Sequence, residues 1–124
     1  MNTPIGACPV QSLEGLRDAL RQFAAERDWD QFHSPKNLAI ALSVEAAELL
    51  EPFQWLSEVN CANLPPETLQ QLREELADVL LYLVRLADKL DIDLMSAAEE
   101  KLQLNAQKYP VDKARGNAKK YTEF

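Results

Sequence analysis

Two acidic pairs are the residues of this chain best suited to chemistry. Glu45 and Glu48 are three positions apart in the sequence, and so are Glu75 and Asp78. Side chains at this spacing share one face of a helix, where like charges repel each other and weaken the helix. Four carboxylates converging from two helices would offer oxygen ligands only, which is the donor set that Mg²⁺ prefers. The pattern therefore predicts a magnesium site for metal-dependent phosphate chemistry.

The helical wheel turns these acids toward the interior of the protein. At about 100° per residue, Glu45 falls beside Leu42 at the apolar edge of its helix, and Glu75 falls beside Val79. A single Glu-x-x-Glu pair is common on solvated helix surfaces, but an inward carboxylate is costly unless something neutralises it. No Lys or Arg occurs at positions 38–56. We therefore expect a metal ion, or a lysine from a later helix, to be the neutralising partner.

A di-iron centre is the competing interpretation of inward glutamates on helices. Such bundles also use Glu-x-x-His motifs, in which the histidine follows a glutamate by three positions. The single histidine, His33, has no such spacing, and we interpret it first as a structural hydrogen-bonding residue. The sequence therefore favours magnesium over iron.

Length and composition favour one globular domain that spans residues 1–124. The chain is 47% hydrophobic and 27% charged with only three glycines, which is typical of a folded protein rich in regular structure. Its formal charge of −7 argues against a nucleic acid polymer as partner, because such binding depends on Lys and Arg contacts to phosphates. A small polyphosphate remains compatible if a divalent metal stands between it and the carboxylates.

The cysteines and the apolar segments indicate a cytoplasmic protein. Cys8 and Cys61 are far apart and form no C-x-x-C or Cys-His pattern, so we expect both to be reduced. Residues 1–10 lack the basic segment and apolar core of a signal peptide, and no segment is apolar for the roughly 20 residues of a membrane helix. We expect no membrane association.

Caps and apolar spacing predict the helices that must position the acids. Ser12, Ser34-Pro35 and Pro65-Pro66 are typical helix starts, and Pro52 must end or bend the second helix. An N-terminal extension (1–11) and a basic C-terminal tail (111–124), extended or irregular, flank the helices. The expected fold is all-α, a four-helix-type bundle with no sheet. The predicted helices cover about 13–27, 35–51, 66–90 and 94–108.

Other residues offer contacts to phosphate and to an aromatic ligand. Lys101, Asn105 and Lys108 follow one another at steps of four and three, so they share a stripe that is either a phosphate contact or simply a solvated face. Trp29 and Trp55, with Tyr82, provide flat surfaces on which a base can stack. Core packing is the ordinary alternative for each aromatic residue.

These motifs together resemble the MazG-like all-α nucleoside triphosphate pyrophosphohydrolases. The acidic pairs are followed by Lys-x-x-x-Asn-x-x-Lys-Tyr-Pro, which begins at Lys101. Residues 23–29, Gln31-Phe32-His33, Phe53-Gln54-Trp55 and residues 120–123 are similar to the dCTP pyrophosphatase branch. The resemblance covers about residues 16–123.

The resemblance implies Mg²⁺-dependent hydrolysis of a nucleoside triphosphate, most simply dCTP or a modified dCTP, to the monophosphate and pyrophosphate. It implies a homodimer or homotetramer. Water would attack the phosphorus in line. The implied residues are as follows: metal ligands Glu45, Glu48, Glu75 and Asp78; a water-orienting residue, either Glu45 or Glu48; and substrate contacts Trp29, His33, Trp55, Tyr82, Lys101, Asn105 and Lys108.

Two departures from the dCTP pyrophosphatase branch leave other functions open. Leu20 stands where the branch has a histidine, and Pro52 stands where it has no proline. Base preference therefore stays open toward another nucleotide such as dUTP. A non-catalytic nucleotide-binding helical scaffold is the second alternative.

Overall fold

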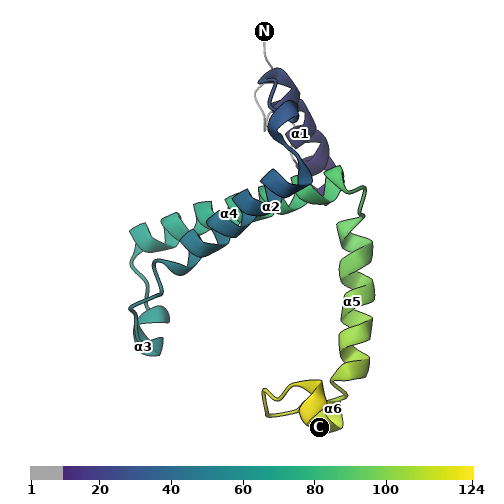
Figure 1. The fold of residues 1–124 in the computed structure, drawn as a ribbon. Helices are drawn as coiled ribbons and strands as arrows, with labels where there is room; N and C mark the ends of the chain where they lie inside the picture. The colour runs from purple at the N-terminus through teal and green to yellow at the C-terminus, as the bar shows by residue number, and fades with distance from the viewer. Residues whose placement is uncertain (1–9) are drawn as a thin grey trace. The chain divides into compact units, whose positions relative to one another are not determined.

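The described part of the protein, residues 10–124 of a computed structural model, is built from helices and contains no strand (Figure 1). This confirms the predicted all-α class. Residues 1–9 lie outside the described part, and with them Cys8 and most of the predicted N-terminal extension. Packing divides the chain into one unit that ends at Asp91 and a second that begins at Ile92.

Four α-helices lie in the described part of the first unit, residues 10–91, and their starts follow from local side-chain chemistry. The hydroxyl of Ser12 accepts from the amide of Gly15 at 2.9 Å, and that of Ser34 accepts from Asn37 at 3.1 Å, so both serines satisfy an otherwise unpaired helical N–H. The predicted starts at these serines are confirmed. The helices are α1 (Leu13–Glu26), α2 (Pro35–Leu50), α3 (Glu58–Cys61) and α4 (Pro66–Lys89), with a 3₁₀ turn at Asp30–Phe32 between α1 and α2.

The segment between α2 and α4 contains a helix that the sequence did not predict. The predicted helices left residues 52–65 as a connection, but Glu58–Cys61 forms α3. The Ser57 hydroxyl caps it by accepting from the Asn60 amide at 3.2 Å. A single capped turn has too few residues to produce a periodic apolar pattern, so sequence spacing cannot reveal it.

Helices α2 and α4 lie side by side, and α1 packs against α4 (Figure 1). Buried apolar side chains come from all three helices: Ala24 of α1, Leu38 of α2, and Leu72, Val84 and Ala87 of α4. Leu38 is only 1% exposed. The α2–α4 pair is the scaffold that matters here, because both acidic pairs lie on it.

The second unit consists of α5 (Leu94–Lys108), α6 (Val111–Ala114) and a 3₁₀ turn at Tyr121–Glu123. We expected residues 111–124 to be extended or irregular, and this is wrong where α6 and the 3₁₀ turn form. Tyr109 meets Tyr121 and Phe124 edge-on, with ring centroids 5.9 and 5.8 Å apart, so aromatic packing folds the end of the chain back onto the end of α5. The Lys108 ammonium lies 5.0 Å from the centroid of the Tyr121 ring.

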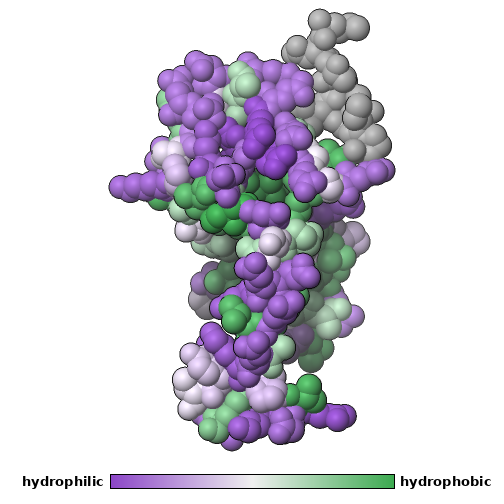
Figure 2. All heavy atoms as spheres, turned by 90° about the vertical axis from the view of Figure 1, so that its right-hand side faces the viewer, coloured by the Kyte–Doolittle hydropathy of each residue, from purple (hydrophilic) through white to green (hydrophobic). Residues whose placement is uncertain are grey.

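Much apolar surface stays exposed on the described helices. On the face drawn in Figure 2, hydrophobic side chains reach the surface among polar ones. Four leucines of α4 are between 38% and 56% exposed, and their spacing places them within one stripe of that helix: Leu69, Leu76, Leu80 and Leu83. A stripe of this kind is typical of a helix that packs against a partner. Every helix between residues 10 and 124 is too short or too polar to cross a membrane.

Candidate functional site

Three of the four predicted metal ligands meet between α2 and α4. Glu45 and Glu48, one turn apart on α2, and Glu75 on α4 each offer a carboxylate oxygen, and these oxygens all lie within 4.8 Å of one another. All three side chains are half-buried. The inward orientation predicted from the helical wheel is therefore confirmed for Glu45 and Glu75.

Like charges at this distance change the protonation of the cluster. The pKa of Glu45 is raised to about 7, first because it shares a hydrogen bond with Glu75, then because burial and the neighbouring Glu48 disfavour its charged form. Glu45 thus keeps its proton up to about pH 7, where an isolated glutamate is ionised.

One oxygen of the cluster has no partner. Oε2 of Glu75 is buried and makes no hydrogen bond with any described residue. A buried carboxylate oxygen without a donor is costly, and a cation would satisfy it. The residues present therefore fit a hard divalent metal, because the donors are all carboxylate oxygens and one of them is unpaired.

Asp78 is not part of this group of three. It lies one turn after Glu75 on α4 and is half-buried, so it shares the face of Glu75. Tyr82, one turn further along the same face, is also half-buried. The role of Asp78 as a fourth ligand stays a prediction.

Trp29 and His33 lie together just before α2 begins. Their ring centroids are 6.4 Å apart in an edge-on arrangement, and Trp29 also meets Phe23 of α1 edge-on at 5.6 Å. Trp29 is 44% exposed, so part of its indole remains available to a ligand. The structure thus brings together two of the predicted substrate contacts, Trp29 and His33.

A buried charged residue, which the sequence patterns did not reveal, holds this pair in place. Arg85 of α4 is 6% exposed, and its Nη2 donates to Asp30 Oδ1 at 2.6 Å while its Nε donates to His33 Nδ1 at 3.1 Å. Lys89 also donates to Asp30. The signal in the sequence was an arginine within the apolar run Leu81–Leu86, three positions after Tyr82 on the same face of the helix.

A second carboxylate completes this charged cluster, which consists of Arg21, Asp30, Arg85, Asp88 and Lys89. Asp88 accepts from the Arg21 Nη2 and Nε at 2.5 and 2.7 Å and lies 3.6 Å from Nη1 of Arg85. The flanking cations hold the pKa of both Asp30 and Asp88 below its ordinary value. The cluster links α1, the turn before α2, and α4.

Trp55 is separated from Trp29 and His33 within the chain. These two residues precede α2 and Trp55 follows it, and the 16 residues of α2 advance about 24 Å along the helix axis. Trp55 is 88% exposed. The structure of one chain therefore does not gather the predicted aromatic contacts around one ligand.

The predicted phosphate contacts lie on α5, in the second unit. Lys101 is exposed, whereas Asn105 and Lys108 are half-buried. The Asn105 carbonyl accepts from the Tyr109 amide at 2.8 Å, and the Lys108 ammonium faces the Tyr121 ring. Their common stripe on one helix is confirmed, but their contact with a phosphate stays a prediction.

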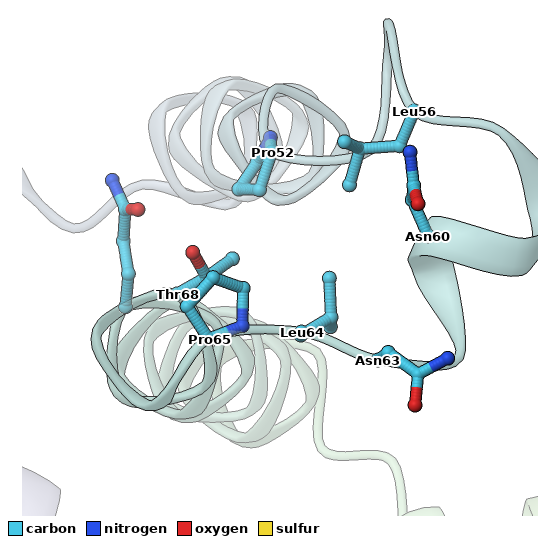
Figure 3. A pocket seen from close by; sticks show the side chains of 8 residues that line it. Pro52, Leu56, Asn60, Asn63, Leu64, Pro65 and Thr68 are labelled. Atoms are coloured by element: carbon cyan, nitrogen blue, oxygen red, sulfur yellow. The ribbon is translucent and has the colours of Figure 1, made fainter.

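A cavity of about 380 Å³ opens at the α3 end of the α2–α4 pair. Figure 3 shows Pro52 and Leu56 facing Thr68, Pro65 and Leu64 across it, with Asn60 and Asn63 at one end. Gln71 also lines the cavity and lies one turn before Glu75 on α4. The lining has no charged side chain, so this cavity suits neither a metal ion nor a phosphate.

Comparisons with known proteins identify relatives over most of this chain. The MazG-like family matches residues 40–124. The chain is 47% identical to dCTP pyrophosphatase 1 of Mus musculus, over 98% of this chain and 72% of that protein, and 45% identical to the protein of the same name from Homo sapiens, over 94% and 69%. The structure is similar to that of a pyrophosphatase from Archaeoglobus fulgidus, with a TM-score of 0.76, 40% identity, and coverage of 83% of this chain and 96% of that one.

Proposed function

The chain belongs to the MazG-like family, and we propose that it hydrolyses dCTP or a modified dCTP to the monophosphate and pyrophosphate. It is a nucleoside triphosphate pyrophosphohydrolase. The observation that carries the proposal is the trio of carboxylates from α2 and α4 in which Oε2 of Glu75 is buried without a donor.

Mg²⁺ is the metal that we assign to this site. Glu45, Glu48 and Glu75 would hold it, with Asp78 as the fourth ligand after a change of side-chain conformation. When bound, Mg²⁺ would neutralise the triphosphate and make the attacked phosphorus more electrophilic. Glu45 or Glu48 orients the attacking water, because a carboxylate that does not bind the metal with both oxygens has an acceptor left for the water.

The base is bound at the other end of the same face of α4. Four residues on one face of α4 follow one another at steps of three and four: Glu75, Asp78, Tyr82 and Arg85. The carboxylates therefore lie at one end of this row, and Arg85, which holds His33, lies at the other. Asp78 and Arg85 are about 10 Å apart along the helix axis. Phosphates near the carboxylates and a base near Trp29 and His33 would fit this order, and Lys101, Asn105 and Lys108 are our candidates for the remaining phosphate oxygens.

A second copy of the chain completes the site in this proposal. Trp55 lies at the far end of α2 from Trp29, but an antiparallel, two-fold related copy would bring its own Trp55 to the Trp29 end. An exposed apolar stripe on α4 supports such an interface, because its four leucines are 38–56% exposed: Leu69, Leu76, Leu80 and Leu83. The assembly is thus a homodimer or a pair of homodimers.

The setting that we propose is a cytoplasmic nucleotide pool without nucleic acid polymer or membrane as partner. The net charge of −7 disfavours polymer phosphates, and Cys61 is a free thiol in the described chain.

The deciding experiment is a panel of triphosphates assayed for pyrophosphate release. Purified protein with Mg²⁺ is given dCTP, 5-methyl-dCTP, dUTP, dTTP, dATP and dGTP, and the products are separated by chromatography. We expect dCMP and pyrophosphate from dCTP, and no turnover in excess EDTA. Highest turnover with dUTP would favour the other pyrophosphohydrolase function. Binding by calorimetry without pyrophosphate from any substrate would favour the scaffold.

A further inference from the structure

Arg85 makes contacts that differ from those of an ordinary buried ion pair. One nitrogen, Nη2, is 2.6 Å from Asp30 Oδ1, and another, Nη1, is 3.6 Å from Asp88 Oδ2. Its third nitrogen, Nε, donates to the imidazole of His33 at 3.1 Å. Asp30 and Asp88 are the charged partners of Arg85, so the contact with the imidazole of His33 is a hydrogen bond in addition to its ion pairs.

This contact fixes where His33 carries its proton. The guanidinium stays protonated at all ordinary pH values, so Nε of Arg85 can only donate, and Nδ1 of His33 must accept with its lone pair. A neutral imidazole has one N–H, which is then at Nε2. Burial, together with the cations Arg85 and Lys89, lowers the pKa of His33 although Asp30 opposes them, so the ring stays neutral near pH 7.

We infer that Arg85 is a positioning residue of the nucleotide site that acts through His33, holding the ring in its Nε2–H tautomer and anchoring the Trp29–His33 segment to α4. The contact of this segment with substrate rests on the proposed function. His33 then serves as a fixed hydrogen-bond donor and not as a general base. Its partner on the substrate is an acceptor, a carbonyl oxygen or unprotonated ring nitrogen of the base.

The shape of the arginine side chain explains why this residue is suited to the task. Its planar fork carries donors on three nitrogens that point in different directions. A lysine has all its donors on one nitrogen, so we expect Arg85→Lys to keep the ion pair with Asp30 and lose the contact with His33. This substitution therefore separates charge from geometry.

The first test reads the tautomer directly in the protein without substrate. Because His33 is the only histidine of the chain, its two ring nitrogens can be observed by ¹⁵N NMR without competing signals. We expect the Nε2–H tautomer alone in the wild type, and mixed tautomers with a higher His33 pKa in Arg85→Gln and Arg85→Lys. An unchanged tautomer in Arg85→Gln would overturn the inference.

The matched control is Arg21→Gln, which removes a cation from the same charged cluster without touching His33. Arg21 pairs with Asp18 on its own helix and with Asp88 on α4, and its side chain is 52% exposed. We expect this variant to lower the melting temperature while leaving the His33 tautomer and KM as in the wild type. If Arg21→Gln disturbs the tautomer as much as Arg85→Gln does, the role of Arg85 is merely structural and the inference fails.

The second test measures kinetics with the best substrate of the triphosphate panel. Loss of one positioned hydrogen bond should raise KM about three- to tenfold in Arg85→Lys and leave kcat within about twofold. In a His33→Ala background the same change should have no further effect on KM. Additive effects would contradict action through His33.

The two proposals fail separately. If the wild type releases pyrophosphate from no triphosphate, the proposed function is wrong, whereas the NMR result on the substrate-free protein still decides the link between Arg85 and His33.

Discussion

Glu45 on α2 and Glu75 on α4 bring carboxylate oxygens within 4.8 Å of each other from two different helices. Their shared hydrogen bond is the main reason that the pKa of Glu45 is raised from 4.5 to about 7. The cluster therefore binds a proton in the folded, metal-free chain at a pH where unfolded glutamates would have lost theirs. Proton and metal compete for the same oxygens.

The first prediction concerns the pH dependence of stability in EDTA. Between pH 4.5 and about 7, Glu45 is protonated in the folded chain but ionised in the unfolded chain. The stability that this proton contributes is therefore complete below pH 4.5 and is lost as the pH rises through 7. The lowered pKa of His33 acts in the opposite direction. We therefore compare wild type with Glu45→Gln, which cannot bind this proton. The melting temperature of the wild type minus that of Glu45→Gln should fall as the pH rises from 5 to 8.

Adding Mg²⁺ should reverse this trend. A bound cation requires ionised ligands, so the rise in melting temperature on adding Mg²⁺ should be larger at pH 8 than at pH 6, and binding should release a proton. Scanning calorimetry and titrations in buffers of different ionisation enthalpy measure both quantities. A rise of equal size at both pH values would mean that Glu45 does not take part.

The second prediction separates Glu75 from its exposed neighbour Glu74. In Glu75→Gln the amide can donate to Glu45 or Glu48, so we expect the melting temperature in EDTA to stay level or rise, while pyrophosphate release falls about 100-fold or more because a metal ligand is lost. Glu74→Gln changes the same charge on an exposed side chain that accepts only from Gln70 at 3.4 Å. It should change neither quantity.

Sequence patterns predicted the scaffold well because its signals are local. A serine hydroxyl caps a helix within three residues, and the apolar spacing that turns Glu45 and Glu75 inward is set within each helix. The convergence of Glu45, Glu48 and Glu75 followed from two such local patterns on helices that pack together.

The missed features depend on contacts between distant segments. In the sequence, Arg85 cannot be distinguished from an ordinary surface arginine of a helix. Only folding brings Asp30 and His33 into contact with it. Likewise, Tyr109 and Phe124 meet because the chain turns back, which no short-range periodicity records. The separation of Trp29 from Trp55 by the length of α2 also became evident only once both ends of that helix were placed.

The third prediction tests the interface proposed for α4. Leu76 is 56% exposed and lies in the stripe with Leu69, Leu80 and Leu83. A charge there would be buried against a second copy, so Leu76→Glu should convert the oligomer to monomer in sedimentation experiments and abolish turnover. Gln70→Glu adds the same charge on another side of α4 and should leave assembly intact. An unchanged oligomer in Leu76→Glu would place the interface elsewhere.

The fourth prediction asks whether Trp55 acts on the site of another copy. Glu48→Gln destroys the carboxylate cluster of its own chain, and Trp55→Ala, at an 88% exposed position, removes the indole that we assign to the partner's site. Each variant alone should be inactive. After subunit exchange in equal amounts, half of the dimers are mixed and each has one complete site, so roughly a quarter of wild-type activity should return. Glu48→Gln mixed with Glu75→Gln serves as the control, because both changes damage clusters built within one chain and no complete site can form. Recovery in that control, or none with Trp55→Ala when mass spectrometry shows mixed dimers, would contradict a site shared between copies.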